Sequence, residues 1–144
     1  MHAGTYRRAL GVLVTTLGML AAATVIAAPA QADPICPMTY KVVDFWPATG
    51  SFPAGFTGTF TLTNKSTTKT TGWRVEVHFR AGVEVTVNWG SEMILDADPV
   101  YVFGNVGHNR EIGPGGSTQF GVNATKTADT ISSTPLSYVC APIW

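Results

Sequence analysis

Apolar and polar residues alternate strictly along two segments of this sequence. From Phe56 to Thr63, every second residue is Phe, Gly or Leu, and the residues between them are all Thr. From Trp73 to Arg80, the residues Trp, Val and Phe alternate with charged or polar ones. Because successive side chains of a strand point to opposite faces, each segment is predicted to be a strand with one buried face.

Further apolar segments extend this pattern. The valines within 83–87 form another row after a turn at 81–82, and the simplest interpretation is a hairpin with the preceding strand. Segments 99–103 and 118–122 are also predicted strands, on either side of the turn-rich segment 104–116. No window has a helical period. Short strands separated by Gly, Pro and Asn turns predict an antiparallel β-sandwich of the immunoglobulin-like or jelly-roll type.

The N-terminal residues have the features of a secretory signal. Two arginines precede an apolar run over residues 9–28, and an Ala-Gln-Ala motif of the kind that signal peptidases cleave follows it. An uncleaved membrane anchor is the alternative, but the basic start, the small-residue end and the polar continuation favour cleavage. We therefore predict a signal peptide over 1–32 and a secreted, extracellular domain over 33–144, in which the Thr/Ser-rich segment 125–134 is a long connection.

The charge of the mature chain argues against a nucleic-acid partner. Without the two N-terminal arginines, seven basic side chains remain against nine acidic ones, a net charge of −2 that is thinly spread. Such a surface is poorly suited to neutralising phosphates. After signal cleavage no segment is apolar enough to cross a membrane, and a chain of this length has room for one domain with one core. We expect a monomer.

Two cysteines, Cys36 and Cys140, lie near the two ends of the mature chain. In an exported protein a disulfide is their expected state. Closing a loop of roughly 100 residues could stabilise the fold by up to about 4–5 kcal/mol in the chain-entropy model. Free thiols or metal ligands are the alternative, although no second Cys or His lies at ligand spacing from either cysteine.

The tryptophans raise the question of which of them face water. Trp73 shares the parity of the apolar residues in its strand, which favours the core. Trp89 shares the parity of the valines before it but lies at the strand end beside polar and small residues, so parity alone leaves its side open. Trp46 lies in the proline-containing stretch 44–53, which is typical of an exposed loop. An exposed ring suits sugar binding, because the C–H face of a pyranose packs on a π-face.

Taken together, the motifs resemble the family 2 carbohydrate-binding modules, which are small β-sandwich domains of secreted bacterial cellulases and xylanases. This resemblance implies paired terminal cysteines, Trp73 in the core, and three exposed aromatics in line on one face, with Trp89 in the middle place. The residues that carry it are Cys36, Tyr40–Asp44, Gly55–Asn64, Gly72–Phe79, Val87–Trp89, Ile112–Ser117, Gln119–Gly121 and Cys140.

The resemblance leaves the first and third aromatic places less clear. Counting forward from Cys36 selects Trp46 for the first place, and counting back from Gly55 selects Phe52; we favour Trp46, with Phe52 beside it. The third place, a Trp in the family, falls on His108. An imidazole has a smaller stacking face than an indole and can gain a charge near neutral pH, and losing one ring could weaken binding about tenfold or more by analogy with base stacking.

Catalytic and metal-binding residues are scarce. The mature chain has two histidines, without HxxxH-type spacing, so we expect no metal and no cofactor. In small lytic oxygenases that act on cellulose and chitin, a histidine at the mature N-terminus holds copper, whereas this chain has Asp33 there. Four carboxylates remain for a glycosidase pair, but on a strand face and in an Asp-rich turn such groups are usually solvated; they are Glu84, Glu92, Asp96 and Asp98.

The sequence therefore predicts a non-catalytic, secreted protein that binds an insoluble β-linked polysaccharide: cellulose, chitin or xylan. Ring spacing and tilt decide among these three. The amides of Asn88, Asn105 and Asn109 are expected to hydrogen-bond sugar hydroxyls at the edges of the row. The alternative is a related sandwich that has lost sugar binding and serves as a protein-interaction or inhibitory module at the cell surface.

Overall fold

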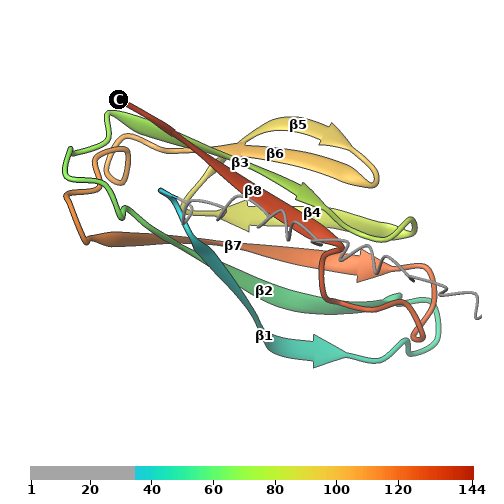
Figure 1. Cartoon of the computed structure of the whole chain (residues 1–144). Coiled ribbons are helices and arrows are strands. Elements are labelled where there is room, and N and C mark those ends of the chain that lie inside the picture. Colours follow the sequence, from blue (N-terminus) through green and yellow to red (C-terminus); the bar gives the residue numbers. More distant parts are fainter. Residues whose placement is uncertain (1–34) are drawn as a thin grey trace, which may run out of the picture. The chain divides into compact units, whose positions relative to one another are not determined.

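The computed structural model describes residues 35–144, which form eight strands and no helix (Figure 1). Within this part of the chain there is accordingly no helix that could span a membrane. The predicted signal peptide lies outside the described residues. The strands are β1 (Met38–Trp46), β2 (Ala54–Thr63), β3 (Gly72–His78), β4 (Val83–Trp89), β5 (Glu92–Ala97), β6 (Val100–Gly104), β7 (Ser117–Lys126) and β8 (Ser137–Ile143).

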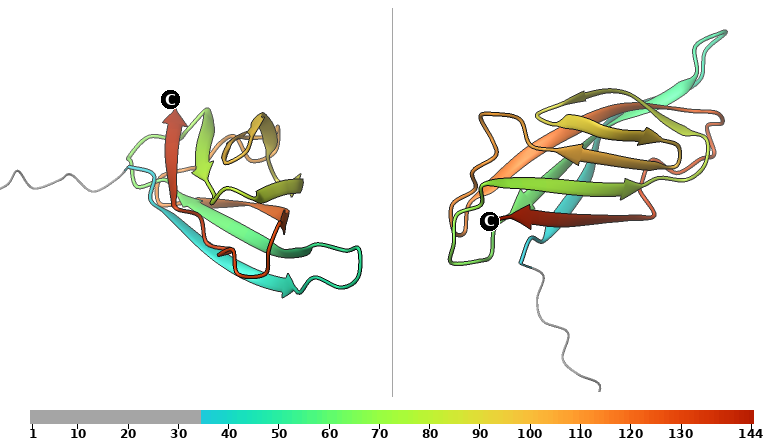
Figure 2. Two further views of the ribbon diagram at one scale, coloured as in Figure 1. Left: turned by 90° about the vertical axis from the view of Figure 1, so that its right-hand side faces the viewer. Right: turned by 90° about the horizontal axis from the view of Figure 1, so that it is seen from above.

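The strands form two four-stranded antiparallel sheets. The first sheet has the order β1-β2-β7-β4, and the second sheet has the order β5-β6-β3-β8. Figure 2 shows the sandwich from two further sides, with the tip of the β1–β2 hairpin projecting beyond the other strands. The predicted antiparallel β-sandwich is confirmed.

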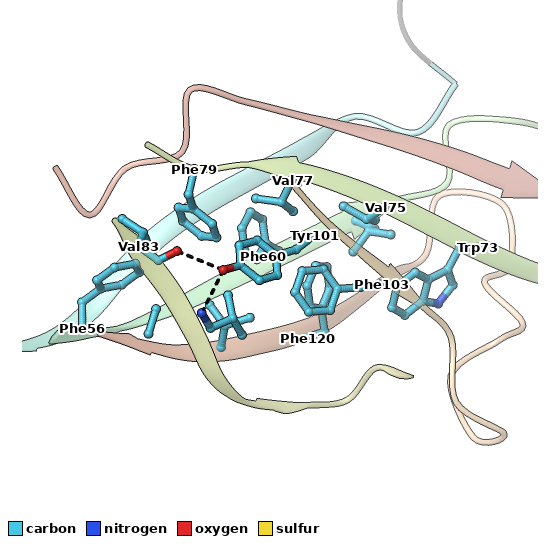
Figure 3. Close-up of a cluster of buried hydrophobic side chains, with 14 of the residues drawn as sticks. Phe56, Phe60, Trp73, Val75, Val77, Phe79, Val83, Tyr101, Phe103 and Phe120 are labelled. Atoms are coloured by element: carbon cyan, nitrogen blue, oxygen red, sulfur yellow. Dashed lines mark hydrogen bonds between the residues drawn. The ribbon is translucent and has the colours of Figure 1, made fainter. Parts of the chain in front are cut away.

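The core between the sheets is rich in aromatic rings (Figure 3). The rings of Phe60 and Phe120 stack with centroids 4.8 Å apart, and Trp73 stacks on Phe120 at 5.5 Å. Trp73 is 1% exposed, as its parity predicted. Because each buried ring of this size is worth about 1.5–3 kcal/mol, this cluster is a major source of stability.

The predicted hairpin between residues 73–79 and 83–87 is wrong. β3 pairs with β6 and β8 in the second sheet, whereas β4 pairs with β7 in the first. The turn before Val83 therefore carries the chain from one sheet to the other. The alternation of apolar and polar residues shows which face of a strand is buried, but not which strand it pairs with. Two strands on opposite sides of the core have the same alternation as two paired strands of a hairpin.

A buried tyrosine ties β4 to the second sheet (Figure 3). The Tyr101 hydroxyl donates to the Val83 carbonyl oxygen at 3.0 Å and accepts from the Val85 N–H at 3.4 Å. Burial raises the pKa of this hydroxyl, so it stays protonated and keeps its role as a donor. Both backbone groups of β4 are thereby satisfied inside the core.

Strands β1, β5 and β8 were not predicted from the sequence. Each is an edge strand of its sheet, and none of them contains a fully buried residue. The inward side chains of β1 and β8, such as Tyr40 and Tyr138, pack against the core but are only partly buried. The Asp-rich turn predicted at Asp96 and Asp98 is correct for Asp98, whereas Asp96 lies in strand β5.

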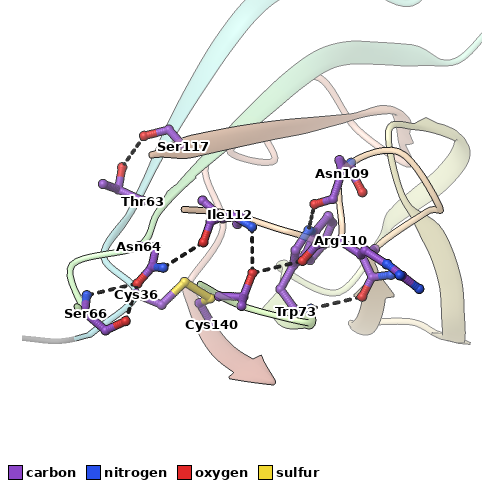
Figure 4. The surroundings of a disulfide bond; sticks show 12 residues. Cys36, Thr63, Asn64, Ser66, Trp73, Asn109, Arg110, Ile112, Ser117 and Cys140 are labelled. Atoms are coloured by element: carbon purple, nitrogen blue, oxygen red, sulfur yellow. Dashed lines mark hydrogen bonds between the residues drawn. A yellow bond between two sulfur atoms is a disulfide. The ribbon is translucent and has the colours of Figure 1, made fainter. Parts of the chain in front are cut away.

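The disulfide between Cys36 and Cys140 is confirmed, with the two Cα atoms 5.8 Å apart (Figure 4). Cys36 lies two residues before the start of β1, and Cys140 lies in β8. The bond therefore joins an edge of the first sheet to an edge of the second and closes one side of the sandwich.

Candidate functional site

The outward side of the first sheet, which we call the platform, carries two indoles. Along β2 the residues on the inward side are buried in the core, so Gly55 and the threonines that alternate with them face outward. Gly121 has the same orientation on β7. Both glycines are nevertheless buried, because an indole from an edge strand covers each of them.

Trp46 is the last residue of β1 and pairs with Gly55. A Cβ atom at Gly55 would overlap the six-membered ring of Trp46. The glycine thus allows the indole to lie across β2, where it is half-buried. One face of the ring rests on the backbone, and this geometry leaves the other side of the ring available to a ligand.

Trp89 is the last residue of β4 and pairs with Gly121, where a Cβ atom would again overlap the indole. A β-bulge between Val85 and Val87 shifts the register by one residue. Val85 points into the core, but Val87 and Trp89, two and four positions later, point outward. Trp89 is 43% exposed. The bulge explains why parity alone could not place this side chain.

A strip of hydroxyl and amide groups runs along β2 and β7, with Thr57 and Asn123 between the two indoles and Thr61 and Gln119 beyond Trp89. The Thr57 hydroxyl donates to the Asn123 amide oxygen at 2.8 Å, and the Gln119 amide donates to the Thr61 hydroxyl at 3.0 Å. The two covered glycines are one strand and four residues apart, which is about 14 Å at standard strand spacings. None of these residues was among the predicted site residues, although the alternating threonines of β2 are visible in the sequence.

His108 is exposed at the tip of a turn that spans residues 106–109. This turn is fixed next to the end of β4, because the amide nitrogen of Asn109 donates to the Gly90 carbonyl oxygen at 2.7 Å. His108 lies beside Arg110 and Glu111 in a shallow depression. The hydrogen bond and charge of Lys69 lower the pKa of Glu111, so this carboxylate stays ionised at neutral pH.

The three predicted asparagines use their amides inside the protein. Asn88 donates to the carbonyl oxygen and the hydroxyl of Ser91, at 2.6 and 3.1 Å. Asn105 accepts from the Trp73 backbone N–H at 3.0 Å. Asn109 is buried, its amide oxygen accepts from the Val106 N–H, and its carbonyl oxygen accepts from the Trp73 indole N–H at 2.9 Å (Figure 4). These contacts hold the segments around Trp73, Trp89 and His108 in place, and the sugar contacts of the three amides stay a prediction.

Phe52, the other candidate for the first aromatic place, lies in the hairpin tip. It pairs with Thr49, and the Trp46–Gly55 pair follows in the same register. Because Phe52 is three positions before Gly55, its parity is opposite to that of Trp46 and Gly55. The structure thus brings Trp46 and Trp89 onto one face of the sheet and does not add Phe52 to it.

Among residues 35–144 no group of three His, Cys, Asp or Glu side chains could hold a metal ion.

A family model and several known proteins match this sequence. The family model described as "Cellulose binding domain" matches residues 36–140. Chitinase 63 of Streptomyces plicatus is 33% identical over 121 residues, which are 83% of this chain and 19% of that protein. A Mycobacterium tuberculosis protein named "Cellulose/chitin binding protein" is 35% identical over 79 residues, which are 55% of each chain. The chain therefore spans about a fifth of the chitinase and about half of the mycobacterial protein.

Solved structures with the same fold are also carbohydrate-binding domains. The solution structure of the cellulose-binding family 2 domain from ScLPMO10C has a TM-score of 0.57 and 27% identity, covering 76% of this chain and 98% of that domain. The chitin-binding domain of Chi18aC from Streptomyces coelicolor has a TM-score of 0.55 and 28% identity, covering 73% of this chain and 89% of that domain.

Proposed function

Because the chain belongs to the cellulose-binding domain family, we propose that it is a secreted, non-catalytic protein that adsorbs to insoluble β-linked polysaccharide through the platform. The observation that carries this proposal is the pair of indoles, Trp46 and Trp89, each laid flat over a glycine on one side of one sheet. A flat, exposed ring costs solubility unless it has a ligand. The names of the relatives make cellulose and chitin the first candidates, and xylan the third.

Binding would combine stacking with hydrogen bonds. The apolar C–H faces of two sugar rings pack on Trp46 and Trp89. The sugar hydroxyls then lie near the polar strip, where Thr57, Asn123 and Gln119 offer both donors and acceptors. Both indoles rest on sheet backbone, so little conformational freedom is lost on binding.

His108 occupies the third aromatic place in this proposal. Its turn is fixed to Gly90, directly after Trp89, so it extends the platform beyond the end of β4. The imidazole offers a smaller stacking face than the indole of the family pattern. Affinity for crystalline substrates should therefore depend mostly on the two tryptophans.

The proposal is tested by incubating the protein with insoluble cellulose, chitin and xylan and measuring what remains in solution. We expect depletion by cellulose or chitin, reversed by none of the simple monosaccharides at moderate concentration. The soluble variant Trp89→Ala should stay in the supernatant. If none of the three polysaccharides depletes the wild-type protein, the proposal is wrong.

A second candidate function, protein binding, is favoured by the outer side of the second sheet. There the exposed hydrophobic side chains are aliphatic and lie beside the charged Arg74 and Glu76 of β3, and Val139 is 63% exposed. Such a patch is typical of a protein contact. The other exposed members are Ile94, Leu95 and Ile143. Retention on polysaccharide that survives Val139→Asp would separate this patch from the proposed sugar-binding function.

A further inference from the structure

Two opposite charges lie next to each other on the outward side of the second sheet, which we call the back face. Arg74 and Glu76 alternate with buried residues of β3 and are exposed. Within residues 35–144 the Arg74 guanidinium forms no ion pair, whereas the Glu76 carboxylate lies 2.6 Å from the His78 ring nitrogen. β3 is an inner strand of its sheet, between β6 and β8. The back face thus has an unpaired cation near its middle, two positions from a carboxylate.

Apolar residues flank these charges on both neighbouring strands. On β8, Val139 pairs with Glu76 and Ala141 pairs with Arg74, so both face outward. On β6, Val102 pairs with Glu76. These five residues line one open depression on the sheet. An exposed apolar surface with charges beside it is typical of a contact with another protein chain.

The back face is complementary to a second copy of itself. A rotation of 180° about an axis that crosses β3 at Val75 reverses the strand and brings the two faces together. Arg74 of one copy then lies over Glu76 of the other, and Glu76 of the first lies over Arg74 of the second. Ala141 likewise lies over Val139 of the second copy, a small side chain against a larger one. Every contact occurs twice, as in the isologous interface of a two-fold dimer.

On the other flank of β3 the same rotation brings apolar surface against apolar surface. Val102 lies level with the carboxylate of β3, and Gly104 lies level with the guanidinium. The Ile94 side chain from β5 covers Gly104, since a Cβ atom there would lie 2.7 Å from the Ile94 Cδ1 atom. Val102 of one copy therefore meets Ile94 of the other. Glu92, a further carboxylate that pairs with Gly104, lies on the edge strand β5, where water can solvate it.

We propose that the protein forms a two-fold dimer through the back face, with the β3 strands of the two copies antiparallel across the interface. The charges select a second copy, because it supplies a carboxylate and a guanidinium in the order and spacing that Arg74 and Glu76 require. A parallel arrangement would put Arg74 against Arg74, and the contact of like charges disfavours it. The apolar flanks supply most of the affinity, and the ion pairs fix the register. This inference replaces the monomer expected from the sequence, where the pairing of β3 with β8 was not visible.

The dimer would carry its two platforms on opposite outer sides. The platform belongs to the first sheet and the back face to the second, so joining two back faces leaves the indoles of both copies exposed. The two platforms then point away from each other and bind two separate polysaccharide surfaces. This consequence rests on the proposed function of the platform. Adsorption to a single surface uses one platform and does not depend on the dimer.

Sedimentation equilibrium of the secreted protein over a range of concentrations tests the dimer. We expect the wild type to change from monomer to dimer as its concentration rises. Arg74→Glu should weaken dimerisation more than about tenfold, because it places carboxylates against each other. The charge swap Arg74→Glu/Glu76→Arg restores both ion pairs and should restore the dimer. Lys41→Glu, an equal change of charge at an exposed position on the first sheet, is the matched control and should associate like the wild type.

Three results would overturn the inference. One is a wild type that stays monomeric up to about 1 mM, the weak end of the affinity scale. Another is a dimer that persists in Arg74→Glu, because the contact would then lie elsewhere on the molecule. The third is loss of the dimer in both Arg74→Glu and the charge swap, which would contradict the facing of Arg74 and Glu76. A thermal melt of each variant excludes unfolding as the cause.

A turbidity measurement tests the bridging of two polysaccharide surfaces. The wild type should flocculate a suspension of fine cellulose or chitin particles, whereas Arg74→Glu should adsorb to the particles equally and leave them dispersed. Flocculation by Arg74→Glu at the wild-type level would contradict bridging through the back face. A wild type that adsorbs to neither polysaccharide would remove the proposed function and the bridging with it, and sedimentation would still decide the dimer.

Discussion

Trp73 and Trp89 differ in what their indoles rest on. Trp73 stacks on Phe120 in the core, and its ring N–H donates to the Asn109 carbonyl oxygen. Trp89 rests on the backbone of Gly121 and keeps an exposed side. Asn109 links the two tryptophans, because its side-chain amide also donates to the carbonyl oxygen of Gly90, the residue after Trp89. The buried tryptophan therefore helps to fix the segment that follows the exposed one.

This difference predicts a large loss of stability on alanine substitution at Trp73 and a small loss at Trp89. Trp73→Ala should lower the free energy of unfolding by about 3–5 kcal/mol, because it leaves a large cavity in the core. Trp89→Ala should lower it by less than about 1 kcal/mol, since a partly exposed side chain loses little burial. Urea denaturation measures both. Equal destabilisation by the two changes would place Trp89 in the core.

Gly121→Ala should weaken polysaccharide binding without removing an aromatic ring. The added Cβ would overlap the Trp89 indole, so the ring must tilt away from β7. We expect adsorption to fall about tenfold, the loss of one stacking contact. Gly113→Ala, where a Cβ meets nothing within 4 Å, is the control and should adsorb like the wild type. Adsorption by Gly121→Ala at the wild-type level would show that the flat placement of Trp89 is unimportant.

At the scale of elements, the strands with a fully buried side were predictable and their partners were not. The alternation in β2 and β3 follows from burial of one side, which the sequence records directly. Pairing depends on contacts with distant strands. The bulge in β4, for example, arises against β7, more than thirty residues later, and it reverses the side of Trp89. The resemblance to a family placed Trp89 outside where parity could not.

The loop between β6 and β7 offers a test of the third aromatic place. His108→Trp should strengthen adsorption to crystalline cellulose or chitin, because an indole has a larger stacking face and loses little conformational freedom. His78→Trp, on the outward side of the second sheet, is the matched control and should leave adsorption unchanged. Binding isotherms for the wild type, His108→Trp and His78→Trp measure this change in affinity. If His108→Trp binds no better than wild type, the third place is not at His108.

At the scale of the molecule, the two outer sides of the sandwich differ in chemistry. The platform has indoles over glycines and a strip of hydroxyl and amide groups, whereas the second sheet presents aliphatic residues such as Val139. Fold class and the terminal disulfide followed from strand patterns and cysteine count. The polar strip could not be selected from the sequence, because it is assembled from strands that meet only in the folded sheet.

The disulfide should matter for stability and not for the platform. Cys36 and Cys140 are 104 positions apart in the sequence, and their bond joins two edge strands far from Trp89 in the strand order. Reduction should lower the free energy of unfolding by about 2–5 kcal/mol and leave adsorption intact at temperatures where the protein stays folded. The double variant Cys36→Ser/Cys140→Ser should behave like the reduced protein. An unchanged denaturation midpoint after reduction would contradict this.

The most direct measurement is the adsorption isotherm of wild type, Trp46→Ala and Trp89→Ala on insoluble cellulose and chitin, with thermal melts of the same samples. If the platform binds the polysaccharide, the wild type adsorbs to at least one substrate, and each variant loses about tenfold or more in affinity, one stacking contact, with a nearly unchanged melting temperature. Adsorption of both variants at the wild-type level, or no adsorption of the wild type to either substrate, would contradict the account.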